Sequence, residues 1–196
     1  ALNERGDEVV GWDRTAVSPT DPAANETFIA DTAPDVLFHL ATAAEPTGIE
    51  NESWRINVAW PAALARICRQ QDIQFVFTSS VMVFSNEAKG PFTLASQPDA
   101  EEAYGLEKRQ AEEKVLGSNP DAIVARLGWQ IGDAPGSNNM VDFLTKTQAE
   151  HGRIPASKLW YPACSFLPDT AAMLLYLLDC APGLYQIDAH ERWTFY

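Results

Sequence analysis

Short apolar runs alternate along the chain with longer stretches in which apolar residues recur every three or four positions. The apolar runs are rich in β-branched and aromatic residues and predict strands at 7–12, 35–40, 73–80, 121–126 and 183–188. The periodic stretches predict helices at 21–33, 51–71, 101–116, 140–152 and 168–180. Strands that alternate with helices favour a mostly parallel sheet with helices on both faces, so the pattern predicts an α/β, Rossmann-type doubly wound fold.

Several of the predicted helices carry recognisable end signals. Asp21 followed by Pro22 is typical of a helix start, because the carboxylate accepts hydrogen bonds from free amides and proline has no amide to satisfy. Asn51 is the candidate cap of the long second helix, and Pro61 should bend that helix or occupy a position that tolerates its missing amide. Gly117 is the predicted end of the third helix.

The candidate chemistry gathers around one strand and the helix that follows it. The 73–80 strand ends in hydroxyl side chains, the last of them Ser80, at the edge where open α/β sheets place their ligands. Tyr104 and Lys108 lie four residues apart, so both side chains leave the same face of the helix. A neighbouring ammonium should lower the pKa of a phenol from its free value of about 10. Tyr104 would then exchange a proton with a substrate oxygen held by Ser80.

The same Tyr-x-x-x-Lys spacing also arises by chance, with the tyrosine half-buried and the lysine in solvent. Ser80 at the end of the preceding strand favours the catalytic interpretation. With Ser80, Tyr104 and Lys108 matching the catalytic Ser/Thr, Tyr and Lys, the chain resembles the extended short-chain dehydrogenase/reductases, the NAD-dependent epimerase/dehydratase family. The Ser-Ser-Val-Met-Val-Phe run at 79–84 resembles a segment of that family, and the segment around Trp129 most resembles dTDP-4-dehydrorhamnose reductases.

The resemblance implies NAD or NADP as the cofactor. Asp13 follows the predicted 7–12 strand, where a dinucleotide fold places an acidic residue on the adenosine ribose. Arg14 is suited to a 2′-phosphate instead, and an ordinary turn is the plain alternative for both residues. The glycine-rich phosphate turn lies about 20 positions before such an acidic residue, so it and the first strand are expected upstream of Ala1. The residues assigned to the cofactor are Asp13, Arg14, Leu40, Ala41, Thr42, Asn57, Thr78, Tyr104, Lys108 and Gly128.

Two polar residues near this set have plainer interpretations. His39 is interpreted as a satisfied core or edge histidine rather than as a catalytic one. Asn57 resembles a family asparagine that supports the active-site strand and a water chain to the lysine, or it is a mid-helix residue that faces solvent. Ser18 to Thr20 would be a short exit from a third strand, and 45–48 and 84–100 are predicted loops.

The resemblance also implies an oxidoreductase that reduces a nucleotide-linked 4-keto sugar, with Tyr104 as the proton donor. Val81 and Met82 stand where a similar 4,6-dehydratase carries Asp-Glu, and apolar side chains cannot move the protons of a dehydration. An NAD-dependent 4-epimerase uses the same three residues and stays open, as do a non-catalytic dinucleotide-binding regulatory subunit and a fragment that binds nothing. Trp129 is interpreted as a pocket wall rather than core filler. The residues assigned to the substrate are Ser80, Val81, Tyr104, Trp129 and Asn139.

By the same resemblance, residues 1–132 form an NAD(P)-binding domain that is incomplete at its N-terminus. Residues 133–196 form a substrate-binding lobe that is interleaved with the last core elements and begins with a turn-rich insertion at 135–139. Family chains continue past the equivalent of Tyr196, so this lobe is expected to be incomplete as well. A homodimer through the second and third helices is common in the family and is one expectation here.

Composition narrows the function further. The chain has 196 residues, 46% of them hydrophobic, which is enough for a sizeable core. Its net charge of −13 argues against a nucleic-acid or anionic-membrane binder, and no apolar run approaches the ~20 residues that span a bilayer.

The three cysteines and three histidines show no metal-ligand spacing, so we expect no metal. Reduced thiols favour a cytoplasmic protein. The cysteines are Cys68, Cys164 and Cys180, and the histidines are His39, His151 and His190.

Overall fold

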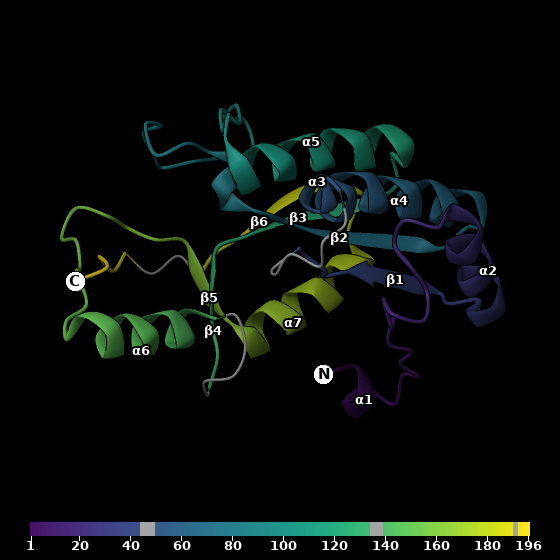
Figure 1. The fold of residues 1–196 in the computed structure, drawn as a ribbon, viewed down its shortest axis with the longest axis horizontal. Helices are drawn as coiled ribbons and strands as arrows, with labels where there is room; N and C mark the ends of the chain where they lie inside the picture. Colours follow the sequence, from purple (N-terminus) through teal and green to yellow (C-terminus); the bar gives the residue numbers. More distant parts are fainter. Residues whose placement is uncertain (44–49, 134–138, 190–191) are drawn as a thin grey trace.

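Four parallel strands form the main sheet, in the order β1–β2–β3–β6 (Figure 1). They are β1 Val36–His39, β2 Gln74–Ser80, β3 Ile123–Leu127 and β6 Gly183–Ile187. The computed structural model describes residues 1–43, 50–133, 139–189 and 192–196. Parallel neighbours need crossover connections, and each connection in this sheet carries a helix, so the predicted α/β, Rossmann-type parallel sheet is confirmed.

Helices cover both faces of this sheet. The helices α4 (Trp60–Gln70) and α5 (Ala103–Ser118) lie on one face, and α7 (Leu167–Tyr176) lies on the other (Figure 1). Successive residues of a strand point to opposite faces, and β2 divides accordingly. One core contains Phe75 and Phe77 with Leu64, Ile67, Ala111 and Val115, and the other contains Val76 with Ile123, Leu174, Leu177 and Ile187. Both faces of β2 are therefore buried, as its apolar run predicts.

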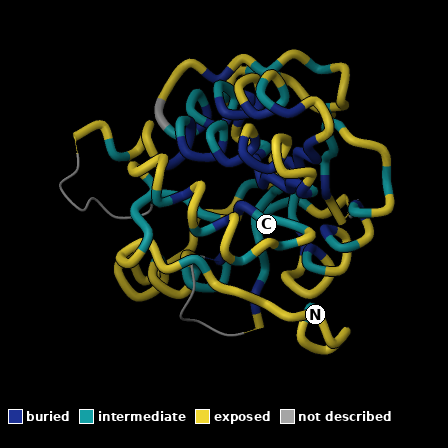
Figure 2. Tube along the Cα trace, turned by 90° about the vertical axis from the view of Figure 1, so that its right-hand side faces the viewer, coloured by how far each residue is buried: buried dark blue, intermediate teal, exposed yellow. Residues whose placement is uncertain are grey.

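The N-terminal part confirms one prediction and overturns another. The helix α2 (Pro22–Thr32) begins as predicted, with the Asp21 side chain accepting from the Ala24 amide at 3.1 Å. The short α1 (Leu2–Arg5) ends at Gly6, whose φ of 86° favours glycine. The predicted strand at 7–12 is wrong, because a strand needs a hydrogen-bonded neighbour and no described strand pairs with it. Residues 7–11 are exposed chain, and Trp12 is half-buried against the core (Figure 2).

Two further predicted features differ in the structure. Ser18 to Thr20 form a turn instead of a strand exit, with the Ser18 hydroxyl accepting from the Thr20 amide at 3.3 Å. The third helix runs past Gly117 to Ser118, because Gly117 does not adopt the left-handed conformation with which a glycine ends a helix. The predicted loop at 45–48 and the turn at 135–138 lie outside the described residues, and so does Ala44.

The predicted 51–71 helix is present in three pieces. It begins with α3 (Glu52–Trp54), passes through a π-helical turn at Arg55–Ala59, and continues as α4. Pro61 stands in the first turn of α4 and has no amide to donate, so a change of helical register just before it is tolerated. Asn51 occupies the cap position, but its side chain makes no capping hydrogen bond.

A second, smaller unit extends from the main sheet (Figure 1). It contains a two-stranded parallel sheet of β4 (Trp129–Ile131) and β5 (Cys164–Phe166), together with α6 (Met140–His151). The predicted helix at 140–152 is thereby confirmed. The elements α7 and β6 return from this part of the chain to the main sheet. A domain boundary at residue 132 stays a prediction.

Candidate active site

The end of β2 and the start of α5 lie directly against each other. Ser80, the last residue of β2, accepts a hydrogen bond from the Met82 amide at 3.1 Å and so fixes the short turn that follows. A Cβ atom on Gly105 would stand 2.3 Å from the Met82 carbonyl oxygen, closer than two such atoms can approach. A glycine is therefore required at this crossing, and it places Tyr104 beside the turn that carries Ser80.

Lys108 lies beneath the tyrosine and away from solvent. Its side chain is among the largest fully buried ones, and Nζ donates to the Thr78 carbonyl at 2.8 Å. The ammonium lies 4.6 Å from the centre of the Phe77 ring and 5.6 Å from that of Tyr104. The chance alternative, which puts the lysine in solvent, is therefore wrong. Burial lowers the pKa of Lys108 to about 8, against the charges of Glu112 and Glu107, which raise it.

The protonation of Tyr104 differs from the expectation. Burial raises the pKa of its phenol to about 12, a hydrogen bond with Thr42 lowers it, and the charge of Glu107 raises it. The predicted lowering of this pKa is not found, because burial of the phenol raises it instead. At neutral pH the phenol is protonated, which suits a proton donor.

A buried asparagine connects the turn after β1 to helix α5. Asn57 lies in the π-helical turn and is 1% exposed, so the solvent-facing alternative is wrong. Its Oδ1 accepts from the Thr42 hydroxyl at 3.1 Å and from the Ala43 amide at 3.0 Å. Its Nδ2 donates to Glu107 Oε2 at 2.8 Å, and the Ser53 hydroxyl donates to the same oxygen at 2.7 Å. These hydrogen bonds fix the turn at 41–43, which is assigned to the cofactor, relative to helix α5, which carries Tyr104.

The other residues assigned to the cofactor lie in three places. Leu40 and Ala41 continue from β1 into the same turn, with Leu40 61% exposed. Thr78 lies one strand away, and its hydroxyl donates to the His39 carbonyl at 3.2 Å. Gly128 is explained by packing alone, because a Cβ there would stand 2.1 Å from the Ala163 carbonyl oxygen.

Asp13 and Arg14 behave differently from each other. Asp13 accepts from the Thr15 amide at 2.8 Å and from its hydroxyl at 2.7 Å, and these bonds lower the pKa of the carboxyl. The carboxylate thus closes a local turn, as the plain alternative supposed. Arg14 reaches across the chain, with Nη1 3.5 Å from the Thr42 carbonyl oxygen. The guanidinium therefore lies beside the turn assigned to the cofactor.

His39 is a core residue, as interpreted, but it is not a satisfied one. Its ring is 3% exposed and packs edge-on against Trp60 at 4.8 Å and beside Phe77 at 5.7 Å. Neither ring nitrogen has a hydrogen-bond partner among the described residues. Burial lowers the pKa of His39 to about 3, assisted by the charges of Lys108 and Arg14.

The residues assigned to the substrate lie in different settings. Val81 follows Ser80 in the short turn and is half-buried. Trp129 packs edge-on against Phe143, Trp160 and Phe195, so it belongs to an aromatic cluster of the smaller unit. The buried Asn139 caps α6, because its Oδ1 accepts from the amides of residues 141 and 142, and its assignment to the substrate stays a prediction.

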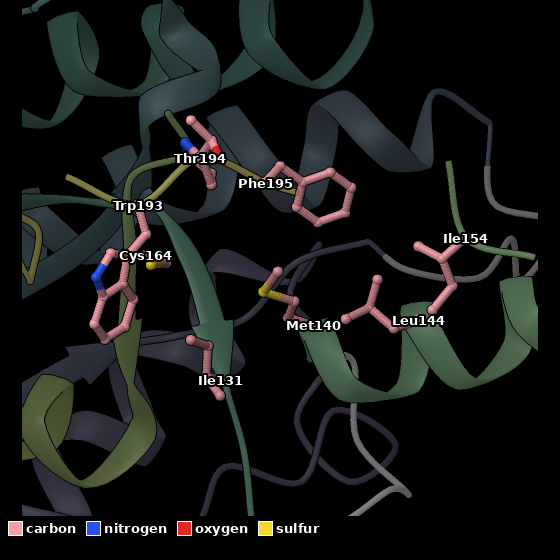
Figure 3. Close-up of a pocket in the computed structure, with 9 residues that line it drawn as sticks. Ile131, Met140, Leu144, Ile154, Cys164, Trp193, Thr194 and Phe195 are labelled. Carbon is pink, nitrogen blue, oxygen red and sulfur yellow. The ribbon is translucent and has the colours of Figure 1, made fainter. Parts of the chain in front are cut away.

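An apolar cavity of about 310 Å³ lies in the smaller unit (Figure 3). Met140 and Leu144 point into it from α6, Ile131 from β4, and Phe195 from the C-terminal segment. Pro162, Cys164, Ile154, Trp193 and Thr194 complete its wall. Ser80, Tyr104 and Lys108 do not line it, so the cavity is separate from the candidate chemistry.

Three residues near the site were not found from the sequence. Gly105 follows Tyr104 directly, which could have drawn attention to it. A glycine is required there because the backbone contacts the turn at Met82, and the local sequence does not show that contact. Glu112 and Arg126 form a buried ion pair of 2.7 Å. Arg126 is a charged residue in an otherwise apolar strand. This pattern indicates a buried partner of opposite charge, which here is Glu112.

No group of three or more His, Cys, Asp or Glu side chains within the described part of the chain could hold a metal ion. The three cysteines are free, and burial raises the pKa of Cys68 to about 12, so that thiol is inert. No helix in these same ranges is long and apolar enough to cross a membrane.

The parallel sheet defines a Rossmann-type α/β protein, and the hydroxyl at the end of β2 with the buried lysine one turn after a tyrosine matches the pattern of an extended short-chain dehydrogenase/reductase. The sequence model of the RmlD substrate binding domain matches residues 1–177, and the chain belongs to that family.

Known proteins resemble the chain over nearly its whole length. A probable low-salt glycan biosynthesis reductase, Agl14 of Haloferax volcanii, is 26% identical over 98% of this chain and 70% of its own. The crystal structure of a dTDP-4-dehydrorhamnose reductase from Clostridium acetobutylicum superposes with a TM-score of 0.84 and 24% identity, covering 100% of this chain and 70% of that one. The reductase of Bacillus anthracis, solved in complex with NADP, gives a TM-score of 0.81 at 18% identity, covering 97% of this chain and 68% of that one.

Proposed function

We propose that the chain is an NAD(P)-dependent oxidoreductase that reduces a nucleotide-linked 4-keto sugar. The observation that carries this proposal is the buried Lys108 beneath Tyr104, at the end of the strand that carries Ser80. The names of the relatives support the substrate class, since they are a glycan biosynthesis reductase and dTDP-4-dehydrorhamnose reductases.

Each of the three residues has a distinct role in this proposal. Ser80 holds the ketone oxygen by a hydrogen bond. Tyr104 donates the proton that converts the developing alkoxide to a hydroxyl, and its raised pKa keeps that proton available at neutral pH. Lys108 places a positive charge beneath the tyrosine and stabilises the phenolate that remains after the proton has left.

The residues around this site fit a nicotinamide dinucleotide. Lys108 has three donors and makes one hydrogen bond among the described residues, so two N–H groups remain for ribose hydroxyls. The turn at Ala41 to Ala43 has small side chains, and Asn57 fixes it from below. Arg14 adds a positive charge beside the turn. The cofactor, when bound, supplies the hydride.

The test is reduction of a dTDP-4-keto-6-deoxy sugar by NADPH or NADH, followed by the loss of nicotinamide absorbance. Tyr104→Phe keeps the ring and removes the proton, so we expect turnover to fall by about 10²- to 10⁴-fold while cofactor binding persists. The matched control is Tyr176→Phe, because Tyr176 is 64% exposed and lies on α7.

Three other outcomes have clear meanings. Full activity of Tyr104→Phe would show that the proton comes from elsewhere. Interconversion of two sugar epimers without net consumption of NAD(P)H would identify the 4-epimerase that uses the same residues. Cofactor binding without turnover of any keto sugar would identify a regulatory subunit.

A further inference from the structure

A second group of buried charges lies beside the three proposed catalytic residues. Arg126 donates to Glu112 through Nε at 2.8 Å and through Nη2 at 2.7 Å, with side chains 2% and 7% exposed. The Ser79 hydroxyl adds a third bond to this carboxylate, at 2.6 Å. A buried carboxylate is thus held by donors from two neighbouring strands.

The members of this group adjoin the proposed catalytic residues in sequence and in space. Ser79 immediately precedes Ser80 on β2, and Arg126 stands directly across from Ser79 on β3. Glu112 lies on α5 one helical turn after Lys108, so both side chains leave the same side of the helix. The group therefore joins α5 to the two central strands at the level of the candidate active site.

Stability alone is a weak reason for such a cluster. Burying two charges costs several kcal/mol of hydration, and apolar residues of similar volume are often as stable. A two-pronged arginine–carboxylate pair, in contrast, fixes both distance and orientation. We infer that the Ser79–Glu112–Arg126 cluster is a positioning device that holds α5 in place on the sheet, so that Tyr104 and Lys108 meet the end of β2. This inference rests on the proposed function.

The same cluster shapes the electrostatic surroundings of Lys108. The groups that face its ammonium are the Thr78 carbonyl of β2, His39 of β1, and Tyr104, Glu107 and Glu112 of α5. His39 is neutral near pH 7, and the two carboxylates favour the protonated lysine. Loss of the Glu112 charge should therefore lower the pKa of Lys108 below its present value of about 8.

The experiment replaces Glu112 by glutamine in the 196-residue chain, which keeps the shape of the side chain and removes its charge. We expect kcat to fall by about ten- to hundredfold, because the approach of α5 to the end of β2 is disturbed. The alkaline limb of the kcat profile should move to lower pH. NMR of labelled lysine should show the lowered pKa of Lys108 without any need for turnover. The control is Glu113→Gln, the exposed neighbour on the same helix.

A merely structural role predicts a lower Tm with no change in the alkaline limb or in the titration of Lys108, and that result would overturn the inference. If Glu112→Gln does not fold, Ser79→Ala decides, because it removes one hydrogen bond and leaves both charges paired. Its kcat should fall several-fold, and an unchanged kcat would be the contrary result. Absence of cofactor binding in the unsubstituted chain would refute the proposed function, while the titration of Lys108 would still test the cluster.

Discussion

A single buried lysine illustrates how function and stability oppose each other in this chain. Charged Lys108 is 2% exposed, and burial lowers its pKa from 10.5 to about 8. The folded state therefore binds the proton less tightly than the unfolded state does. The cost is present in full below pH 8 and is relieved as the pH rises from about 8 to 10.5.

Replacement of this lysine by methionine should thus stabilise the protein and abolish its turnover. We expect the free energy of unfolding at pH 7 to rise by about 1 to 3 kcal/mol for Lys108→Met. Urea unfolding and the reductase assay measure the two effects on the same sample. Lys114→Met, an exposed change on the same helix, should leave both quantities nearly as they were. A less stable Lys108→Met variant would contradict the assigned cost.

The cofactor preference is also set by single residues. The Asp13 carboxylate accepts two hydrogen bonds from Thr15, whereas the Arg14 guanidinium lies beside the Thr42 carbonyl. A guanidinium in this place should bind a 2′-phosphate, so we predict that NADPH binds more tightly than NADH. Arg14→Ala should weaken NADPH by about ten- to hundredfold and NADH much less. Fluorescence titration with both cofactors measures this, with Arg69→Ala as an exposed control. Equal weakening of both would remove Arg14 from the 2′-phosphate site.

At the scale of elements, the crossing of α5 over the turn after β2 depends on one glycine. A methyl group on Gly105 would stand 2.3 Å from the Met82 carbonyl oxygen and 2.9 Å from the Ala100 Cβ. The backbone cannot yield as a flexible side chain can, so α5 must move away from the sheet. Gly105→Ala should cost about 1 to 3 kcal/mol of stability and reduce kcat by roughly a hundredfold.

Gly117 offers a matched control on the same helix. Nothing lies within 4 Å of a Cβ built there, so Gly117→Ala should be neutral or stabilise the helix by up to about 1 kcal/mol. Thermal unfolding and kcat are measured for both variants. The comparison distinguishes the effect of alanine on helix propensity from its effect on the contact between α5 and the turn after β2. If the two alanine variants had equal unfolding temperatures and equal kcat values, the close approach at Gly105 would have no role in stability or turnover.

The elements that the sequence predicts correctly are those whose pattern reflects their own burial. The strand before Ser80 is apolar at residues 75–77 because both its faces are covered there, and the Tyr104–Lys108 spacing follows from helix geometry alone. The failures depend on distant partners. The 7–12 segment has the residues of a strand but no neighbour, and the protonation of Tyr104 depends on burial by elements far away in the chain.

Paired charges are the hardest part to predict. Glu112 and Arg126 are 14 residues apart and meet only because α5 folds back over β3. Asn57 and Glu107 are separated by 50 positions. No local pattern encodes either contact. The homodimer expected through the second and third helices stays a prediction, because it depends on contacts with a second chain that no local pattern encodes.

For the whole molecule, the consequence of the buried His39 is a loss of stability in mild acid. Its pKa is 6.5 in the unfolded chain and about 3 in the folded one, so the unfolded state binds more protons throughout that window. The contribution of His39 is complete above pH 6.5 and is lost as the pH falls toward 3. Between pH 7.5 and pH 5 this amounts to about 2 kcal/mol in the free energy of unfolding.

The measurement is urea unfolding at pH 7.5, 6 and 5 for the unsubstituted chain and for His39→Phe. Phenylalanine fits the aromatic contacts with Trp60 and Phe77 and does not titrate. The variant should therefore lose most of the acid sensitivity, whereas His151→Asn, a change at an exposed histidine, should keep it. An unchanged pH slope in His39→Phe would mean that other groups carry the acid response, and that the unpartnered imidazole accepts a proton more readily than its burial implies.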